Sequence, residues 1–333
     1  MTAQSTTSPE VHDEPRVART RGKLVDWKFL VATAIVGALL VGSLLIGEYD
    51  VFNAQDGIDM FSITRVPRTI ALVLAGAAMA MCGLVMQMLT QNRFVSPTTT
   101  GTTEWAGLGL LFVMIVFPGA TVMGRMVGAV VFSFVGAMVF FFFLQRVSLR
   151  SSLIVPIVGI MLGAVVSAVS TFVALQTDML QQLGVWFAGS FTSVYKGQYE
   201  VLWVVLLVVV GVFLLADRLT LAGLGEDFAT SVGMNYRRIV LVGTVMVAIA
   251  VGVVTVVVGN LPFLGLIVPN IVSMIRGDDL RSNLPWVCLV GIATVAACDL
   301  LARTLISPFE IPVSVVLGIV GAIVFVVLIV RNR

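Results

Sequence analysis

Ten long apolar runs follow one another along the chain, and short polar or charged segments separate them. All but one are close to the ~20 residues that a helix needs to cross the hydrocarbon core of a bilayer. Only 11% of the 333 residues are charged, against roughly 25% in an average soluble domain, which is too few to cover a soluble surface. The sequence therefore predicts an all-α membrane protein with about ten transmembrane helices.

The ten predicted spans can be placed by position. The eighth, at 263–275, is short for a span. Two alternatives follow for it: a tilted helix, or a helix that continues past Arg276. The runs lie at 29–47, 68–90, 99–117, 121–144, 152–176, 199–216, 236–258, 263–275, 284–304 and 311–330.

Lysine and arginine residues set the orientation of these spans. With the N-terminus in the cytoplasm, fifteen of the 20 basic residues fall on the cytoplasmic side and five fall outside. The opposite threading would reverse this bias. The chain is therefore predicted to be N-in and C-in, as a multi-pass protein of the cell membrane. The five basic residues outside are Arg65, Arg68, Arg125, Lys196 and Arg303.

The first 28 residues differ from the rest, because they are polar and carry five basic residues. Residues 1–28 are predicted to form a disordered cytoplasmic tail. The apolar run that follows has about 18 residues, longer than the core of a signal peptide, and no cleavage site follows it. We therefore expect a retained first helix and a single transmembrane domain over 29–333.

Residues that most enzyme and metal sites need are missing from this sequence. The Gly22-Lys23 pair lacks the rest of a phosphate-binding loop, and the lone histidine, His12, falls in the predicted tail. We expect no enzyme activity and no cofactor in this chain, and a net charge of +2 gives no signal for nucleic acid. Three cysteines fall inside apolar runs and are predicted to be free: Cys82, Cys288 and Cys298.

The longest predicted cytoplasmic loop between spans covers residues 217–237. In it, a glycine followed by two acids predicts a helix start, because acids suit the positive end of the helix dipole. A short apolar face and a second glycine then predict a short, capped, amphipathic helix. Such a helix suits docking on a soluble partner; the alternative is a helix lying on the membrane surface. Its residues are Leu224, Gly225, Glu226, Asp227, Phe228, Ala229 and Gly233.

Two acidic residues fall inside predicted spans, and each costs roughly 2.5–3.5 kcal/mol at a helix centre unless it is paired or solvated. Asp299 has Arg303 four residues later on the same helix face, which favours a structural ion pair over an ion site. Glu104 opens the third span, where a polar contact is favoured over a proton relay. Because so few charged residues lie inside the spans, we expect a transporter that is driven by an external energy source. The alternatives are an ion-coupled secondary transporter and a membrane scaffold.

Several motifs stand in order along the chain. The second span opens with Arg65-Val-Pro-Arg68, the eighth with Pro262-Phe-Leu-Gly-Leu-Ile-Val-Pro269, and the last with Glu310-Ile-Pro-Val313. Together with the loop at 224–233, they resemble the permease subunits of ABC importers for iron-siderophores, haem and vitamin B12. The resemblance runs from about residue 29 to the C-terminus.

This resemblance implies a type II ABC importer permease fold that works as a dimer, with itself or with a paralogue. It implies that the coupling loop at about 217–237 contacts cytoplasmic ATPase subunits, which hydrolyse the ATP. It also implies an extracytoplasmic binding protein that delivers the ligand. Spans 2–5 and 7–10 are then expected to be similar units of opposite orientation.

Two positions depart from the family pattern: Asn270 follows the last proline of the eighth-span motif, and Thr102-Thr-Glu-Trp105 replaces a stretch of small residues. Both resemble the branch associated with catecholate siderophores, which implies a ferric chelate as the cargo. From their positions in the third and fifth spans, four polar residues are expected to line the path. These are Glu104, Ser167, Ser170 and Thr171.

Overall fold

The computed structural model describes residues 27–47, 57–146 and 154–331, and these residues form helices and connecting segments without a strand. Of the predicted tail at 1–28, only Trp27 and Lys28 are described, and they begin the first helix. The prediction for the rest of the tail lies outside the described residues.

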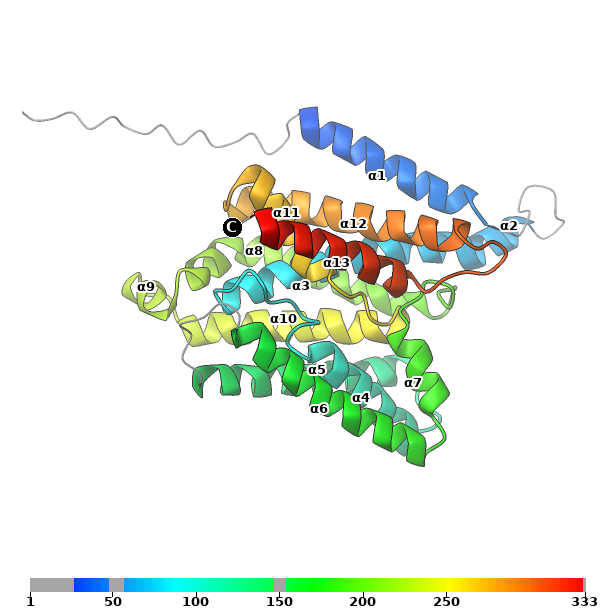
Figure 1. Ribbon diagram of the computed structural model, residues 1–333, viewed down its shortest axis with the longest axis horizontal. Helices are drawn as coiled ribbons and strands as arrows, with labels where there is room; N and C mark the ends of the chain where they lie inside the picture. Colours follow the sequence, from blue (N-terminus) through cyan, green and yellow to red (C-terminus); the bar gives the residue numbers. More distant parts are fainter. Residues whose placement is uncertain (1–26, 48–56, 147–153, 332–333) are drawn as a thin grey trace, which may run out of the picture.

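Ten long helices match the ten predicted spans, and all run roughly along one direction of the bundle (Figure 1). By length and composition, seven are apolar enough to cross a membrane, and α4, α11 and α13 are shorter apolar helices. The prediction of an all-α membrane protein is confirmed. The helices are α1 (Trp27–Leu45), α3 (Val66–Leu89), α4 (Thr102–Val116), α5 (Val122–Arg146), α6 (Ile154–Gln176), α8 (Val204–Gly223), α10 (Tyr236–Val257), α11 (Leu264–Arg276), α12 (Leu280–Thr304) and α13 (Val313–Arg331).

Short elements lie at the two ends of this bundle. One end carries α2 and α7, and the opposite end carries α9 (Figure 1). The predicted orientation makes the α9 end cytoplasmic and the other end external. The short elements are α2 (Gly57–Met60), the π-helix η1 (Phe61–Arg65), α7 (Leu180–Phe187), the 3-10 helix η2 (Tyr199–Trp203) and α9 (Glu226–Ser231).

The most buried of the long helices is α3, which packs against α8, α10, α11 and α12. Glycines let these helices approach closely. A Cβ on Gly83 would lie 1.8 Å from the carbonyl oxygen of Gly265 in α11, and one on Gly291 of α12 would lie 2.6 Å from the Gly76 oxygen. Lipid supplies no hydrophobic drive between helices, so this close packing is a main source of their association.

Helix packing repeats between the two halves of the chain. As α3 packs on α11 and α12, so α10 packs on α4 and α5, and α8 contacts both α3 and α10. In Figure 1, α3 runs from the α2 end towards the α9 end, while α10 runs the opposite way. The arrangement agrees with two similar units of opposite orientation.

The structure excludes one of the two alternatives predicted for the short eighth span, a helix that continues past Arg276. Helix α11 ends at Arg276, where Gly277 has φ +84°, so it does not continue. The segment before it, 258–263, is irregular yet buried, with Leu261 inaccessible to solvent. Irregular backbone is tolerated at membrane depth where protein surrounds it, so this segment accompanies the short helix. In the first half, the irregular segment 90–101 precedes the short helix α4 in the same way; Gln91 and Arg93 at its start are exposed, and its later part, 95–101, is largely buried.

The sixth span is longer than predicted, because α8 continues to Gly223. Asp217 and Arg218 were expected to begin a loop, but they lie on the exposed face of the helix. On its other face Leu219 and Ala222 stay buried. The prediction that the loop begins at 217 is therefore wrong.

A network of charges ties the external ends of the helices together. Asp299, fully buried in α12, forms ion pairs with Arg303 (2.6 Å) and with Arg68 of α3 (2.8 Å). Arg68 also pairs with Glu310, between α12 and α13, at 3.0 Å. The sequence predicted the i, i+4 pair of Asp299 and Arg303. The ion pairs of Arg68 with Asp299 and Glu310 result from the tertiary fold.

Two arginines attach α1 at the same end, although little of α1 is buried. Arg303 donates to the carbonyl oxygens of Ile46 (2.9 Å) and Ser43 (3.2 Å). Arg65 donates to that of Leu44 at 2.9 Å. The last carbonyls of a helix lack partners within the helix, and cations suit its negative end. These arginines therefore cap the helix that the bundle packs least.

Replacing Gly83 by alanine should prevent correct packing of α3 against α11, because its Cβ would overlap backbone atoms that cannot move aside. We expect a large loss of folded protein, measured as the yield of monodisperse protein from membranes. The matched control is Gly37→Ala in α1, where nothing lies within 4 Å of the added Cβ. A normal yield for Gly83→Ala would contradict the close contact.

Replacing Asp299 by asparagine should destabilise the fold by about 3–5 kcal/mol, because the buried Arg303 would lose its counter-charge and Arg68 would keep only Glu310. The measurement is the thermal unfolding midpoint of the purified protein. Asp217→Asn removes the acid of an exposed ion pair with Arg281 and should leave the midpoint nearly unchanged. Equal effects of the two variants would show that the buried network contributes no special stability.

Candidate functional site

Helix α9 lies in the connection between α8 and α10, where the sequence predicted a short docking helix. Gly225 precedes it with φ +108°, a conformation that favours glycine. After it, Gly233 has φ +81°, and the amide of Met234 donates to the carbonyl of Ala229 at 3.0 Å. The predicted start and stop of this helix agree with its geometry.

Apolar side chains project from α9 and its N-terminal flank. Leu224, Phe228 and Val232 are each about half exposed or more, whereas Ala229 is buried against the bundle. The helix thus presents an apolar face away from the protein at the predicted cytoplasmic end. An exposed apolar patch beside acids on a short loop helix is typical of a protein-docking surface.

The α8–α9 corner rests directly on the end of α3. A Cβ on Gly223 would lie 2.8 Å from the sulfur of Met88, and one on Gly225 would lie 3.5 Å from the side chain of Gln91. The corner is thus in direct contact with the end of the central helix α3.

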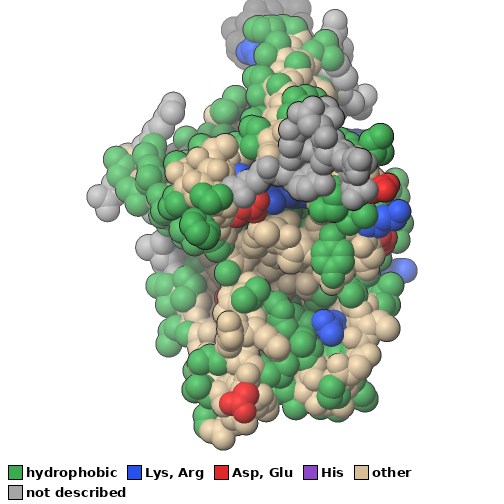
Figure 2. All heavy atoms as spheres, turned by 90° about the vertical axis from the view of Figure 1, so that its right-hand side faces the viewer, with side chains coloured by type: hydrophobic (Ala, Val, Ile, Leu, Met, Phe, Trp, Pro, Cys, Tyr) green, Lys and Arg blue, Asp and Glu red, His purple; other side chains and the backbone are tan. Residues whose placement is uncertain are grey.

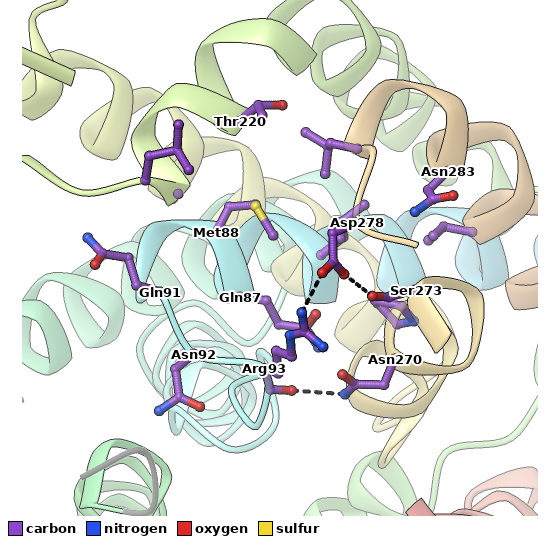
Figure 3. Close-up of a pocket in the computed structure, with 16 residues that line it drawn as sticks. Gln87, Met88, Gln91, Asn92, Arg93, Thr220, Asn270, Ser273, Asp278 and Asn283 are labelled. Carbon is purple, nitrogen blue, oxygen red and sulfur yellow. Dashed lines mark hydrogen bonds and ion pairs between the residues drawn. The ribbon is translucent and has the colours of Figure 1, made fainter. Parts of the chain in front are cut away.

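Beside this corner, the ends of α3, α8, α11 and α12 enclose a cavity of about 310 Å³ (Figure 3). On one side of it, Arg93 pairs with Asp278 at 2.6 Å, and Ser273 donates to the same carboxylate. Asn270 donates to the carbonyl of Arg93 at 2.9 Å. These bonds join the segment after α3, in the first half of the chain, to the end of α11, in the second half.

Asn270 is one of the two departures from the family pattern, and its role was missed in the sequence. Its amide also donates to the carbonyl of Leu266 at 2.7 Å. The signal available beforehand was a polar residue in the middle of an apolar motif. Its partner, Arg93, lies 177 positions earlier, which no local pattern could indicate.

The four residues expected to line the path differ in their exposure to solvent. Thr171 is exposed on α6 and Ser167 is partly exposed. Ser170 is fully buried and donates to the carbonyl of Val166 at 2.9 Å, so the prediction that it lines a path is wrong. The Oε2 atom of Glu104 is buried close to Gly163 of α6 and has no hydrogen-bond partner in the described part of the chain.

Helix α7 is a short helix at the end of the bundle that also carries α2 (Figure 1). Leu183 is buried in a small cluster with Leu111 and Ala174, and Trp186 and Phe187 pack against that cluster. The helix is thus seated on α4 and α6, beside the candidate path residues.

Among the described residues, no group of three or more His, Cys, Asp or Glu side chains could hold a metal ion. Cys82, Cys288 and Cys298 are free thiols.

Sequence comparison places the chain among importer permeases. The model of the FecCD transport family matches residues 30–331. The petrobactin import system permease protein FatD of Bacillus anthracis is 61% identical over 92% of this chain and 91% of its own length. The petrobactin import system permease protein YclN of Bacillus subtilis is 41% identical over 84% of this chain and 88% of its own length.

Structure comparison agrees. A solved inward-facing conformation of a metal-chelate type ABC transporter superposes with a TM-score of 0.78 at 26% identity, covering 92% of this chain and 99% of that one. PsaBC from Streptococcus pneumoniae shares the fold, with a TM-score of 0.62 at 14% identity over 87% of this chain and 94% of that one. The chain belongs to the FecCD transport family and is a membrane-spanning permease subunit of the type II ABC importer fold.

Proposed function

We propose that this permease moves a ferric siderophore inward, driven by ATPase subunits that dock on α9. The observation that carries the proposal is the exposed apolar face of α9, at residues 224–232, at the predicted cytoplasmic end. The ATPase subunit supplies ATP hydrolysis, and this chain supplies the path. Since the α8–α9 corner rests on Met88 and Gln91, closure of the ATPases would shift the end of α3 and the helices packed on it.

A second permease subunit and an extracytoplasmic binding protein complete the proposed importer. The exposed side of α6, with Ser167 and Thr171, is our candidate for one wall of the path. The binding protein would dock at the end carrying α2 and α7 and release its ligand between two permeases. The path itself needs only weak contacts with a large chelate.

The cargo proposed for this chain is a ferric siderophore of the petrobactin kind. Two relatives named as petrobactin permeases are 61% and 41% identical to this chain, whereas vitamin B12 permeases of the family stand near 30%. The ferric-anguibactin permease FatD of Vibrio anguillarum lies between them at 36%. The catecholate type of the chelate stays a prediction.

Replacing Phe228 by serine should weaken assembly with the ATPase roughly thirtyfold, the effect of losing one central interface side chain. The measurement is the amount of ATPase subunit that co-purifies with the permease, together with ATP hydrolysis by the complex. Ile58→Ser is the matched control, because Ile58 is equally apolar and more exposed but lies on α2 at the opposite end. Full assembly and transport by Phe228→Ser would show that α9 is not the docking helix.

Deletion of the gene should abolish growth when ferric petrobactin is the sole iron source, since this chelate would have no other path. Growth on a ferric hydroxamate should persist, and vitamin B12 uptake should be unchanged. The measurement is growth of the deletion strain with one chelate at a time, and the control is the same strain carrying the wild-type gene. Normal growth on ferric petrobactin together with loss of another cargo would refute this choice.

A further inference from the structure

The segment 188–198 follows α7 and crosses the external end of the bundle. Backbone hydrogen bonds hold it at three places: the Ser314 amide donates to the Gly189 carbonyl at 3.2 Å, the Ser190 amide donates to the Val258 carbonyl at 2.8 Å, and the Lys196 amide donates to the Ile63 carbonyl at 2.9 Å. Such bonds do not depend on side-chain identity. Between them, the side chains of Phe191 and Val194 are buried in the hydrophobic core, and the hydroxyl of Thr192 makes a polar contact with another part of the chain.

This contact is a hydrogen bond from the hydroxyl of Thr192 to the carboxylate of Glu310, at 2.6 Å. Arg68 donates to both oxygens of the same carboxylate at 3.0 Å. Glu310 therefore joins three parts of the chain: the segment 188–198, the start of α3, and the connection between α12 and α13. Figure 2 looks onto this end, where few charged side chains are visible: some acidic and basic ones lie side by side, and others stand singly among apolar and polar surface.

Glu310 differs in accessibility from the other acid of the network. The Asp299 side chain is 0% exposed, whereas that of Glu310 is 31% exposed, so water or a partner can reach it. If Glu310 moves away, Arg68 keeps its ion pair with Asp299 at 2.8 Å. Breaking the bonds to Glu310 thus strands no buried charge, and the rest of the network holds the helices in place.

We propose that Glu310 is a latch that fastens the segment 188–198 to α3, and that docking of the extracytoplasmic binding protein opens it. The proposal rests on the importer function proposed above. Helix α7 sits on α6, our candidate wall of the path, and the latched segment continues from α7. Opening the latch removes a polar tie at the mouth where the ligand enters, so this side of the segment can shift while Phe191 and Val194 stay in the core.

The charge of Glu310 keeps the latch closed at neutral pH. Burial alone would raise the pKa of this carboxyl, but the hydrogen bond from Thr192 and the positive charge of Arg68 lower it overall. A carboxyl with a lowered pKa stays ionised throughout the neutral range, and its bonds are lost only as the pH falls through that lowered value. A partner, rather than ordinary pH, must therefore open the latch.

Two variants open the latch in different ways. Thr192→Val removes the donor without changing charge, and Glu310→Gln removes the charge with little change of shape. In the intact permease–ATPase complex in lipid nanodiscs, both should speed amide hydrogen exchange of 188–198. Both should also tighten binding of the binding protein encoded with the permease, by roughly three- to tenfold, since wild type must spend part of its docking energy on opening. Asp59→Asn, which removes an exposed acid of α2 at the same end, is the matched charge control and should change neither.

The sign of the affinity change separates a latch from a docking contact. Weaker binding by Thr192→Val and Glu310→Gln would mean that these side chains touch the partner, and it overturns the latch. Unchanged binding and exchange overturn it as well, as does an equal effect of Asp59→Asn. If the wild-type complex binds no such protein, both the proposed importer function and the latch are overturned. If the wild type binds it and the two variants bind it with the same affinity, only the latch is overturned.

Discussion

The contact between Gly83 and Gly265 brings the backbones of α3 and α11 so close that no side chain fits between them. Lipid tails are as apolar as the helices, so the bundle depends on such close approach rather than on hydrophobic burial. Because α3 also contacts α8, α10 and α12, its position fixes the others. The same helix carries Arg68 at its external end and leads to Gln91 at the cytoplasmic end.

The two ends of α3 make different kinds of contact. At the external end, buried charges hold α1, α3 and α12 together through Asp299 and Arg303. At the other end, the α8–α9 corner meets α3 through methionine and glutamine side chains, which are flexible. Buried charges at one end, and flexible side chains where the α8–α9 corner meets α3, suit a permease that a separate ATPase subunit drives.

Irregular backbone inside the bundle follows from the repeat. The segments 90–101 and 258–263 each precede a short helix, α4 or α11, in equivalent places of the two halves. Gly101 (φ +79°) and Phe263 (φ +60°) adopt the same left-handed turn just before those helices. Protein surrounds most of both segments, which removes the cost of exposing their backbone polar groups to lipid.

The sequence alone determined the membrane class, the number and places of the helices, the orientation, and the start and stop of α9. These depend on apolar run length, charge placement and glycine, which act locally or through the bilayer. It failed for Ser170, because a helix that is apolar on every side gives no sign of which face is buried. The sequence pattern also predicted that the sixth span ends before Asp217, because two exposed charged residues there obscured the buried face that continues to the end of α8. Only the tertiary structure joined Arg68 to Asp299 and to Glu310, since contacts between residues 231 or 242 positions apart are set by how helices pack and not by any local pattern.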